Sequence, residues 1–157
     1  MKPKSWEKTL DERLPLFGHR NWIVVADSAY PAQSSPGIET IISGVGQQAA
    51  IKTVLARLRA SKHVRPVVHV DRELALVDEK DAHGIDSYRN WLKGVLKGLS
   101  VTMTPHDEII SKLDHAARMF SVLIVKTTMT IPYTSVFIEL DCGYWDANSE
   151  ARLRARV

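Results

Sequence analysis

The chain has 157 residues, a formal net charge of +3, 45% hydrophobic residues and 25% charged residues. These values are those of an ordinary globular domain, and they exclude disordered, collagenous and membrane-spanning compositions. The single cysteine, Cys142, excludes an intrachain disulfide framework and favours a reducing compartment.

The two ends of the sequence indicate neither export nor nucleic-acid binding. Residues 1–7 lack the apolar run of a signal peptide, and no stretch approaches the roughly 20 apolar residues that span a bilayer. We therefore expect a cytoplasmic protein without membrane contact. The short basic tail at residues 146–157 is narrower than the patch that nucleic-acid-binding proteins carry, so we expect a solvated or subunit-contacting end and no nucleic-acid partner.

The first half of the sequence alternates helical and strand patterns. A weak helical pattern over residues 10–17 ends before Gly18, and the continuous apolar run at residues 22–26 predicts a buried strand. Residues 38–42 predict a second strand. An apolar stripe at helical spacing over residues 51–58 then predicts an amphipathic helix.

The same alternation continues through the middle of the sequence. Residues 66–70 predict a strand, residues 85–99 a helix, and residues 99–103 another strand. A further helix is expected to begin with Thr104 as its N-cap and Pro105 at its first position, and to continue as far as Phe120.

Two last apolar segments, at residues 121–125 and 135–140, complete the predicted strands. The alternation predicts a three-layer α/β fold, in which a mixed, mostly parallel sheet has helices on both faces. Because the sequence has no internal repeat, low-complexity tract or linker, we expect one domain over residues 1–157, with its core at about residues 14–143.

The strand at residues 22–26 is flanked by the first two candidate site residues. His19 lies in a glycine-containing turn before it, and Asp27 follows its end. Loops outside strand ends line the crevices of α/β folds, although a surface histidine and a turn aspartate would give the same pattern. Eight extended positions would separate the two by about 26 Å. They can share a site only if the flanks fold back or if neighbouring subunits supply different residues.

Two further clusters carry groups that suit a polyhydroxylated ligand. His106 is expected near the start of a helix, where a neutral imidazole can accept a hydrogen bond from a sugar hydroxyl; an exposed helix-start histidine is the alternative. Tyr133, Thr134 and Ser135 place a phenol and two hydroxyls in the loop before the last strand. An ordinary turn would explain that loop equally well.

A metal hydrolase is the alternative that His69 and Asp71 raise. Their side chains would face one side of a strand, as two metal ligands could. No third ligand with suitable spacing is visible, so we expect no metal site.

Taken together, these clusters resemble the ribose pyranase and fucose mutarotase (RbsD/FucU) family. The resemblance covers about residues 14–143 and implies a single domain of the RbsD-like type. The matching stretches are Gly18-His19 with the following strand and residues 27–32, residues 104–108, residues 121–125 and residues 132–138.

The resemblance implies an isomerase that interconverts the anomers, or the pyranose and furanose forms, of a free aldose without a cofactor. It implies His19 as the catalytic proton donor or acceptor, and Asp27, His106, Tyr133 and Ser135 as substrate-binding residues. An imidazole with an ordinary pKa near 6.5 suits such proton transfer. Ser135 stands where the family usually has Asn, which leaves a catalytically silent monosaccharide-binding or regulatory protein of the same fold as the alternative.

The resemblance also implies an assembly and a substrate class. Family members are homo-oligomers built from rings, as decamers or other ring-based assemblies, with monosaccharide sites between adjacent subunits. Such sites would remove the distance difficulty between His19 and Asp27. Residues 27–31 are more similar to the fucose type and His106 to the ribose type, so both sugars are candidates.

Overall fold

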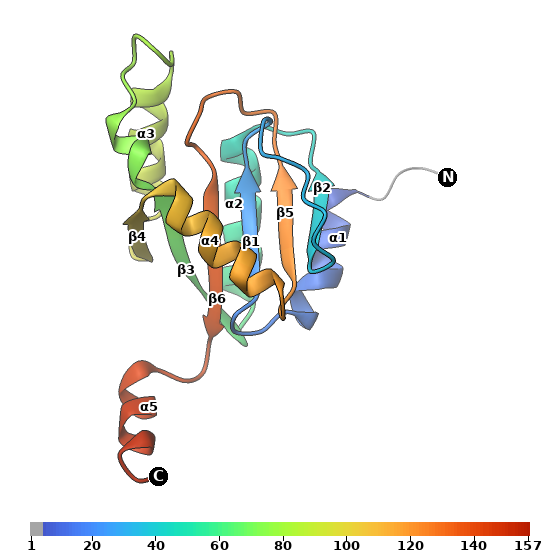
Figure 1. The fold of residues 1–157 in the computed structure, drawn as a ribbon, viewed down its shortest axis with the longest axis vertical. Coiled ribbons are helices and arrows are strands. Elements are labelled where there is room, and N and C mark those ends of the chain that lie inside the picture. The colour runs from blue at the N-terminus through green and yellow to red at the C-terminus, as the bar shows by residue number, and fades with distance from the viewer. Residues whose placement is uncertain (1–4) are drawn as a thin grey trace.

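The computed structural model describes residues 5–157, which form one sheet flanked by helices. The strand order is β2-β5-β1-β6-β3-β4, and β6 is antiparallel to its two neighbours while all other pairs are parallel. In Figure 1, β1 and β5 point upward and β6 points downward. The strands are β1 (Trp22–Ala26), β2 (Ile38–Ile42), β3 (Val64–Asp71), β4 (Ser100–Thr104), β5 (Val122–Lys126) and β6 (Val136–Cys142).

Helices cover both faces of this sheet, as Figure 1 shows for α4 in front and α2 behind. Along β1, Trp22, Val24 and Ala26 pack in the cluster that includes α4, whereas Ile23 and Val25 pack with α1, α2 and α3 on the other face. Successive strand residues point to opposite faces, so a strand covered on both sides is apolar at every position. The predicted three-layer, mostly parallel α/β fold is confirmed. The helices are α1 (Trp6–Arg13), α2 (Gln47–Ala60), α3 (Ile85–Val95), α4 (His106–Ala117) and α5 (Ala147–Arg154), with 3-10 turns η1 (Leu14–Leu16) and η2 (Arg72–Leu76).

The start of α4 differs from the sequence-based expectation. Thr104 is the last residue of β4, and Pro105 is the N-cap residue without a side-chain cap. The backbone N–H of His106 donates instead to the Glu73 carboxylate, at 3.0 and 3.2 Å from its two oxygens. A carboxylate at a helix N-terminus satisfies an otherwise free N–H and is favoured by the helix dipole. The helix also ends at Ala117, before the predicted Phe120.

The basic tail contains a helix that the sequence did not predict. The Asp146 side chain accepts a hydrogen bond from the Ser149 N–H at 2.6 Å and so begins α5. This helix buries no residue, and Figure 1 shows it extending away from the sheet. Among residues 5–157, no helix combines the length and apolar character that crossing a membrane requires.

Candidate functional site

One edge of the sheet gathers most of the predicted site residues. The carboxyl ends of β1, β3 and β4 lie there, and because β6 is antiparallel its first residue lies there too. Ligands of open α/β sheets bind at this edge, in the crevice outside the strand ends. A pocket of about 430 Å³ opens there, within the size range of small-molecule sites. Its lining residues are Asp27, Ala29, Tyr30, Pro31, Gln33, Asp71, His106, Asp107, Ile110, Pro132, Tyr133 and Ser135.

Four of the five predicted site residues line this pocket, and two of them are bonded to each other. The Ser135 hydroxyl donates to Asp27 Oδ1 at 2.7 Å and accepts from the Asp27 backbone N–H at 3.1 Å. This reciprocal pair fixes the Asp27 carboxylate at the end of β1. An ionised carboxylate has several acceptor positions, so Asp27 can still accept hydrogen bonds from a ligand's hydroxyls.

His106 enters the pocket from the first position of α4. Its Nδ1 lies 2.9 Å from Asp71 Oδ1, and its ring stands edge-on to Tyr133 and Phe137, at centroid distances of 5.7 and 6.3 Å. The His106 side chain is 35% exposed, whereas that of Asp71 is 1% exposed. A buried carboxylate therefore holds the imidazole at Nδ1, while about a third of the His106 side chain stays accessible.

The loop before β6 holds Tyr133 in a left-handed backbone conformation, with φ of 61°. A residue other than glycine pays about 1–2 kcal/mol for this conformation, and such strain clusters at functional sites. The phenol of this pocket-lining residue contacts the His106 ring, and 40% of the Tyr133 surface is exposed. The strain thus supports the inclusion of Tyr133 in a binding site.

The pocket is also lined by buried polar atoms that lack a hydrogen-bond partner. Within residues 5–157, four buried side-chain polar atoms have no hydrogen-bond partner, and three of them belong to pocket residues: Tyr30 Oη, Gln33 Oε1 and Asp71 Oδ2. A buried polar group without a partner costs about 1–3 kcal/mol, so such groups are normally satisfied by water or a ligand. Burial raises the pKa of Tyr30 well above its ordinary range, which keeps its hydroxyl available as a donor. The pocket lining therefore offers buried polar atoms that a polar ligand can satisfy.

Burial raises the pKa of Asp71 above its ordinary value of 3.8, and the bond to His106 offsets this only in part. The folded protein then holds the Asp71 proton more tightly than the unfolded chain does. The ionised carboxylate accordingly lowers stability at neutral pH, and this cost disappears as the pH falls below about 3.8.

We therefore expect Asp71→Asn to raise the free energy of unfolding near neutral pH. The difference from the wild type should shrink toward zero as the pH falls below about 4, where Asp71 is protonated in both states. Urea denaturation of the wild type and of Asp71→Asn, at several pH values from neutral to below about 4, measures this difference in the free energy of unfolding. A variant that is less stable than the wild type at neutral pH would show that the bond to His106 outweighs the burial cost.

His19, the fifth predicted residue, lies at the opposite edge of the sheet. It is exposed in the turn before β1, next to Arg20, whose N–H bonds the Leu140 carbonyl near the far end of β6. It lines a different cavity, of about 640 Å³, together with Arg65 and Asp141. The five residues of β1 keep its first and last residues about 13 Å apart. A single chain does not bring His19 and Asp27 together, so their sharing of one site through neighbouring subunits stays a prediction.

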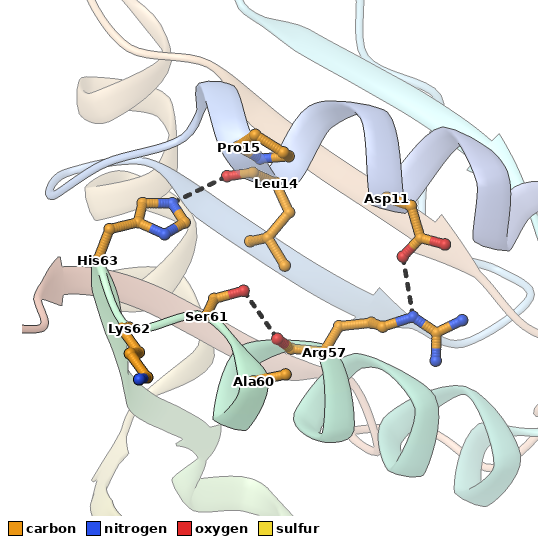
Figure 2. A pocket seen from close by; sticks show the side chains of 8 residues that line it. All are labelled: Asp11, Leu14, Pro15, Arg57, Ala60, Ser61, Lys62 and His63. Carbon is orange, nitrogen blue, oxygen red and sulfur yellow. Dashed lines mark hydrogen bonds and ion pairs between the residues drawn. The ribbon is translucent and has the colours of Figure 1, made fainter.

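A further cavity, of about 470 Å³, lies where the ends of α1 and α2 meet (Figure 2) and contains none of the predicted site residues. Most of its polar side chains are already bonded within the protein. Arg57 donates to Asp11 at 2.8 Å, and His63 Nε2 lies 3.1 Å from the Leu14 carbonyl. This cavity therefore offers less to a polar ligand than the pocket at the strand ends.

His69 and Asp71, which suggested a metal hydrolase, have separate partners. His69 Nε2 lies 3.1 Å from Glu139 and the His69 ring stacks on Trp22, whereas Asp71 bonds His106. Residues 5–157 contain no group of three or more His, Cys, Asp or Glu side chains placed to hold a metal ion. Asp71 instead belongs to the pocket.

The three lining residues with an unpartnered buried polar atom, Tyr30, Gln33 and Asp71, were not predicted as parts of this site. For Asp71 a signal was present, because an aspartate directly after an apolar strand lies at the carboxyl end where α/β ligands bind. Tyr30 and Gln33 lie in a loop of polar and small residues, where nothing in the local pattern separates a buried side chain from an exposed one.

Comparison with known proteins supports the fold. No protein-family model and no curated protein matches the sequence. Among solved structures, Bacillus subtilis RbsD complexed with D-ribose aligns over 90% of this chain and 98% of its own, with a TM-score of 0.58 and 19% identity. The chain has the RbsD/FucU fold. The similarity indicated by the sequence motifs is thereby confirmed at the level of the fold.

Two fucose-related structures share the RbsD/FucU fold to a similar degree. A fucose mutarotase from Streptococcus pneumoniae, in complex with L-fucose, aligns over 90% of this chain and 98% of its own, with a TM-score of 0.58 and 18% identity. FucU from Bifidobacterium longum aligns over 85% of this chain and 93% of its own, with a TM-score of 0.56 and 16% identity. The shared architecture extends over nearly the whole of each chain.

Proposed function

We propose that the protein is a monosaccharide mutarotase or pyranase that binds a free aldose in the pocket at the strand ends. The observation that carries this proposal is the collection of unpartnered buried polar atoms there, on Tyr30, Gln33 and Asp71. An aldose presents several hydroxyls, each of which can donate and accept, and so matches a pocket that needs both. The fold supports the same class of ligand, because two of the solved structures that share it hold D-ribose and L-fucose.

The residues would divide the work between binding and proton transfer. Asp27, His106, Tyr133 and Ser135 would orient the sugar. Ring opening needs a proton to leave the anomeric hydroxyl and another to reach the ring oxygen, with no redox change. Imidazole side chains do both near neutral pH, and we assign His19 of a neighbouring copy as the catalytic residue at the ring oxygen. The assembly is then a homo-oligomer whose sites lie between subunits, as in a ring.

The proposal predicts faster exchange between the forms of at least one free aldose. Saturation-transfer NMR on ribose, fucose and related aldoses, with and without the protein, measures this exchange directly. General acid–base catalysis adds on the order of 10²–10⁴-fold to the rate at the bound sugar. Uncatalysed rates for every aldose in the panel would contradict the proposed activity.

A catalytically silent monosaccharide-binding protein is the second candidate, and the geometry of Ser135 favours it. The Ser135 hydroxyl hydrogen already goes to Asp27, so this residue offers the sugar no free donor. Under this alternative, a sugar shifts the NMR signals of pocket residues but its own forms exchange at the uncatalysed rate. The same NMR samples distinguish the two candidates.

A further inference from the structure

The imidazole of His106 is held by only one of its two nitrogens. Nδ1 lies 2.9 Å from Asp71 Oδ1, while Nε2 has no hydrogen-bond partner among residues 5–157. An ionised carboxylate only accepts hydrogen bonds, so Nδ1 carries the proton in this pair. The neutral ring then has its lone pair on Nε2, the nitrogen without a hydrogen-bond partner among the described residues.

Asp71 is placed to act through this ring. It ends β3, its side chain is 1% exposed, and its second oxygen, Oδ2, is buried without a partner. Interactions between charges are stronger at such a site than in water. A buried carboxylate on Nδ1 therefore both fixes the tautomer and stabilises the imidazolium that forms when Nε2 takes up a proton.

The other acids near His106 do not contact its imidazole. Glu73, from η2, accepts from the backbone N–H of His106, whereas Asp27 and Asp107 line the pocket without a hydrogen bond to the ring. The ring contacts from Tyr133 and Phe137 are edge-on and do not involve either ring nitrogen as a hydrogen-bonding atom. Asp71 is thus the group that sets the protonation pattern of this imidazole.

We infer that Asp71 is a positioning residue for the proposed sugar isomerisation, one that holds His106 in the Nδ1–H tautomer so that Nε2 accepts a proton from the bound aldose. This inference rests on the proposed function. The anomeric hydroxyl gives its proton to Nε2, and the O–H electron pair becomes the second bond of the C1 carbonyl. The electron pair of the bond from C1 to the ring oxygen passes to that oxygen, which takes a proton from His19 of the neighbouring copy. Reclosure returns both protons, and nothing is oxidised or reduced.

The test compares the wild type with Asp71→Asn, His106→Ala and Glu108→Gln. The asparagine keeps the size of Asp71 but removes its charge. Glu108→Gln removes a charge from the same first turn of α4 at an exposed position outside the pocket, so it is the matched control. Two readouts are recorded: kcat and KM for aldose exchange by saturation-transfer NMR, and the ¹⁵N shifts of the two His106 nitrogens in ligand-free protein at a pH where imidazoles are neutral.

We expect the wild type and Glu108→Gln to show a protonated Nδ1 and an unprotonated Nε2, and Asp71→Asn to show a mixture of tautomers. In Asp71→Asn, kcat should fall about tenfold or more while KM stays within a few-fold, and His106→Ala should lose at least as much. A wild-type tautomer together with a wild-type kcat in Asp71→Asn would overturn the inference. If the wild type does not accelerate the exchange of any aldose, the proposed function fails. The tautomer is measured without a sugar, so an unchanged His106 tautomer in Asp71→Asn would overturn the positioning role independently of that result.

Discussion

Replacing His19 by alanine is expected to remove the catalysed part of aldose exchange, a fall on the order of 10²–10⁴-fold. Its imidazole is the group assigned to protonate the ring oxygen, and no other residue of its turn, Gly18 to Asn21, carries an imidazole or a carboxyl group that could replace it. His19 is exposed and its side chain makes no hydrogen bond within residues 5–157, so the substitution should leave the fold intact.

The matched control for this variant is His83→Ala, which removes an exposed loop histidine that lines none of the described pockets. Saturation-transfer NMR on the most responsive aldose compares both variants with the wild type. Equal rates in His19→Ala and the wild type would remove His19 from the mechanism.

Mixing variants tests whether His19 and Asp27 come from different subunits. His19→Ala and Asp27→Asn should each be inactive alone. When the two are co-assembled at random in equal amounts, about a quarter of the shared sites combine an intact Asp27 with an intact His19. Recovery of about that fraction of activity supports a site between subunits, and the absence of any recovery would count against it.

Phe137→Ala is expected to lower the free energy of unfolding by about 3–5 kcal/mol. Phe137 is fully buried in the core between the sheet and α4, so the substitution leaves a large cavity there. A loss of that size is a large part of the roughly 5–15 kcal/mol that stabilises a typical domain. The rings of Tyr30 and His106 pack against the Phe137 ring, with centroid distances of 6.1 and 6.3 Å. Because both residues line the pocket, Phe137→Ala should lower the affinity for the aldose as well.

Ile138→Ala provides the comparison for that experiment. Ile138 is the next residue of β6 and is equally buried, but it packs in the core on the opposite face of the sheet. Ile138→Ala should lower the free energy of unfolding by about 2–5 kcal/mol without disturbing the aromatic rings of the pocket. Urea denaturation measures stability, and NMR titration with the sugar measures affinity. An equal loss of affinity in both variants would show that Phe137 acts on the site only through overall stability.

The sequence alone determined most of the layout of strands and helices because that signal is local. The apolar run at Trp22–Ala26 and the helical stripe in Gln47–Ala60 each predict an element from consecutive residues. The short polar motifs at Asp27, His106 and Ser135 indicated the pocket for the same reason, since each follows or precedes such an element. The tail helix Ala147–Arg154 escaped prediction because it buries nothing and so leaves no apolar pattern.

The tertiary structure decided which polar groups meet. Asp71 and His106 are 35 positions apart in sequence, and Glu73 rather than Thr104 bonds the first N–H of α4. These contacts depend on β3 and β4 lying side by side, which no local pattern encodes. The structure likewise placed His19 and Asp27 at opposite ends of β1, because an extended strand keeps its two ends apart however short the intervening sequence is.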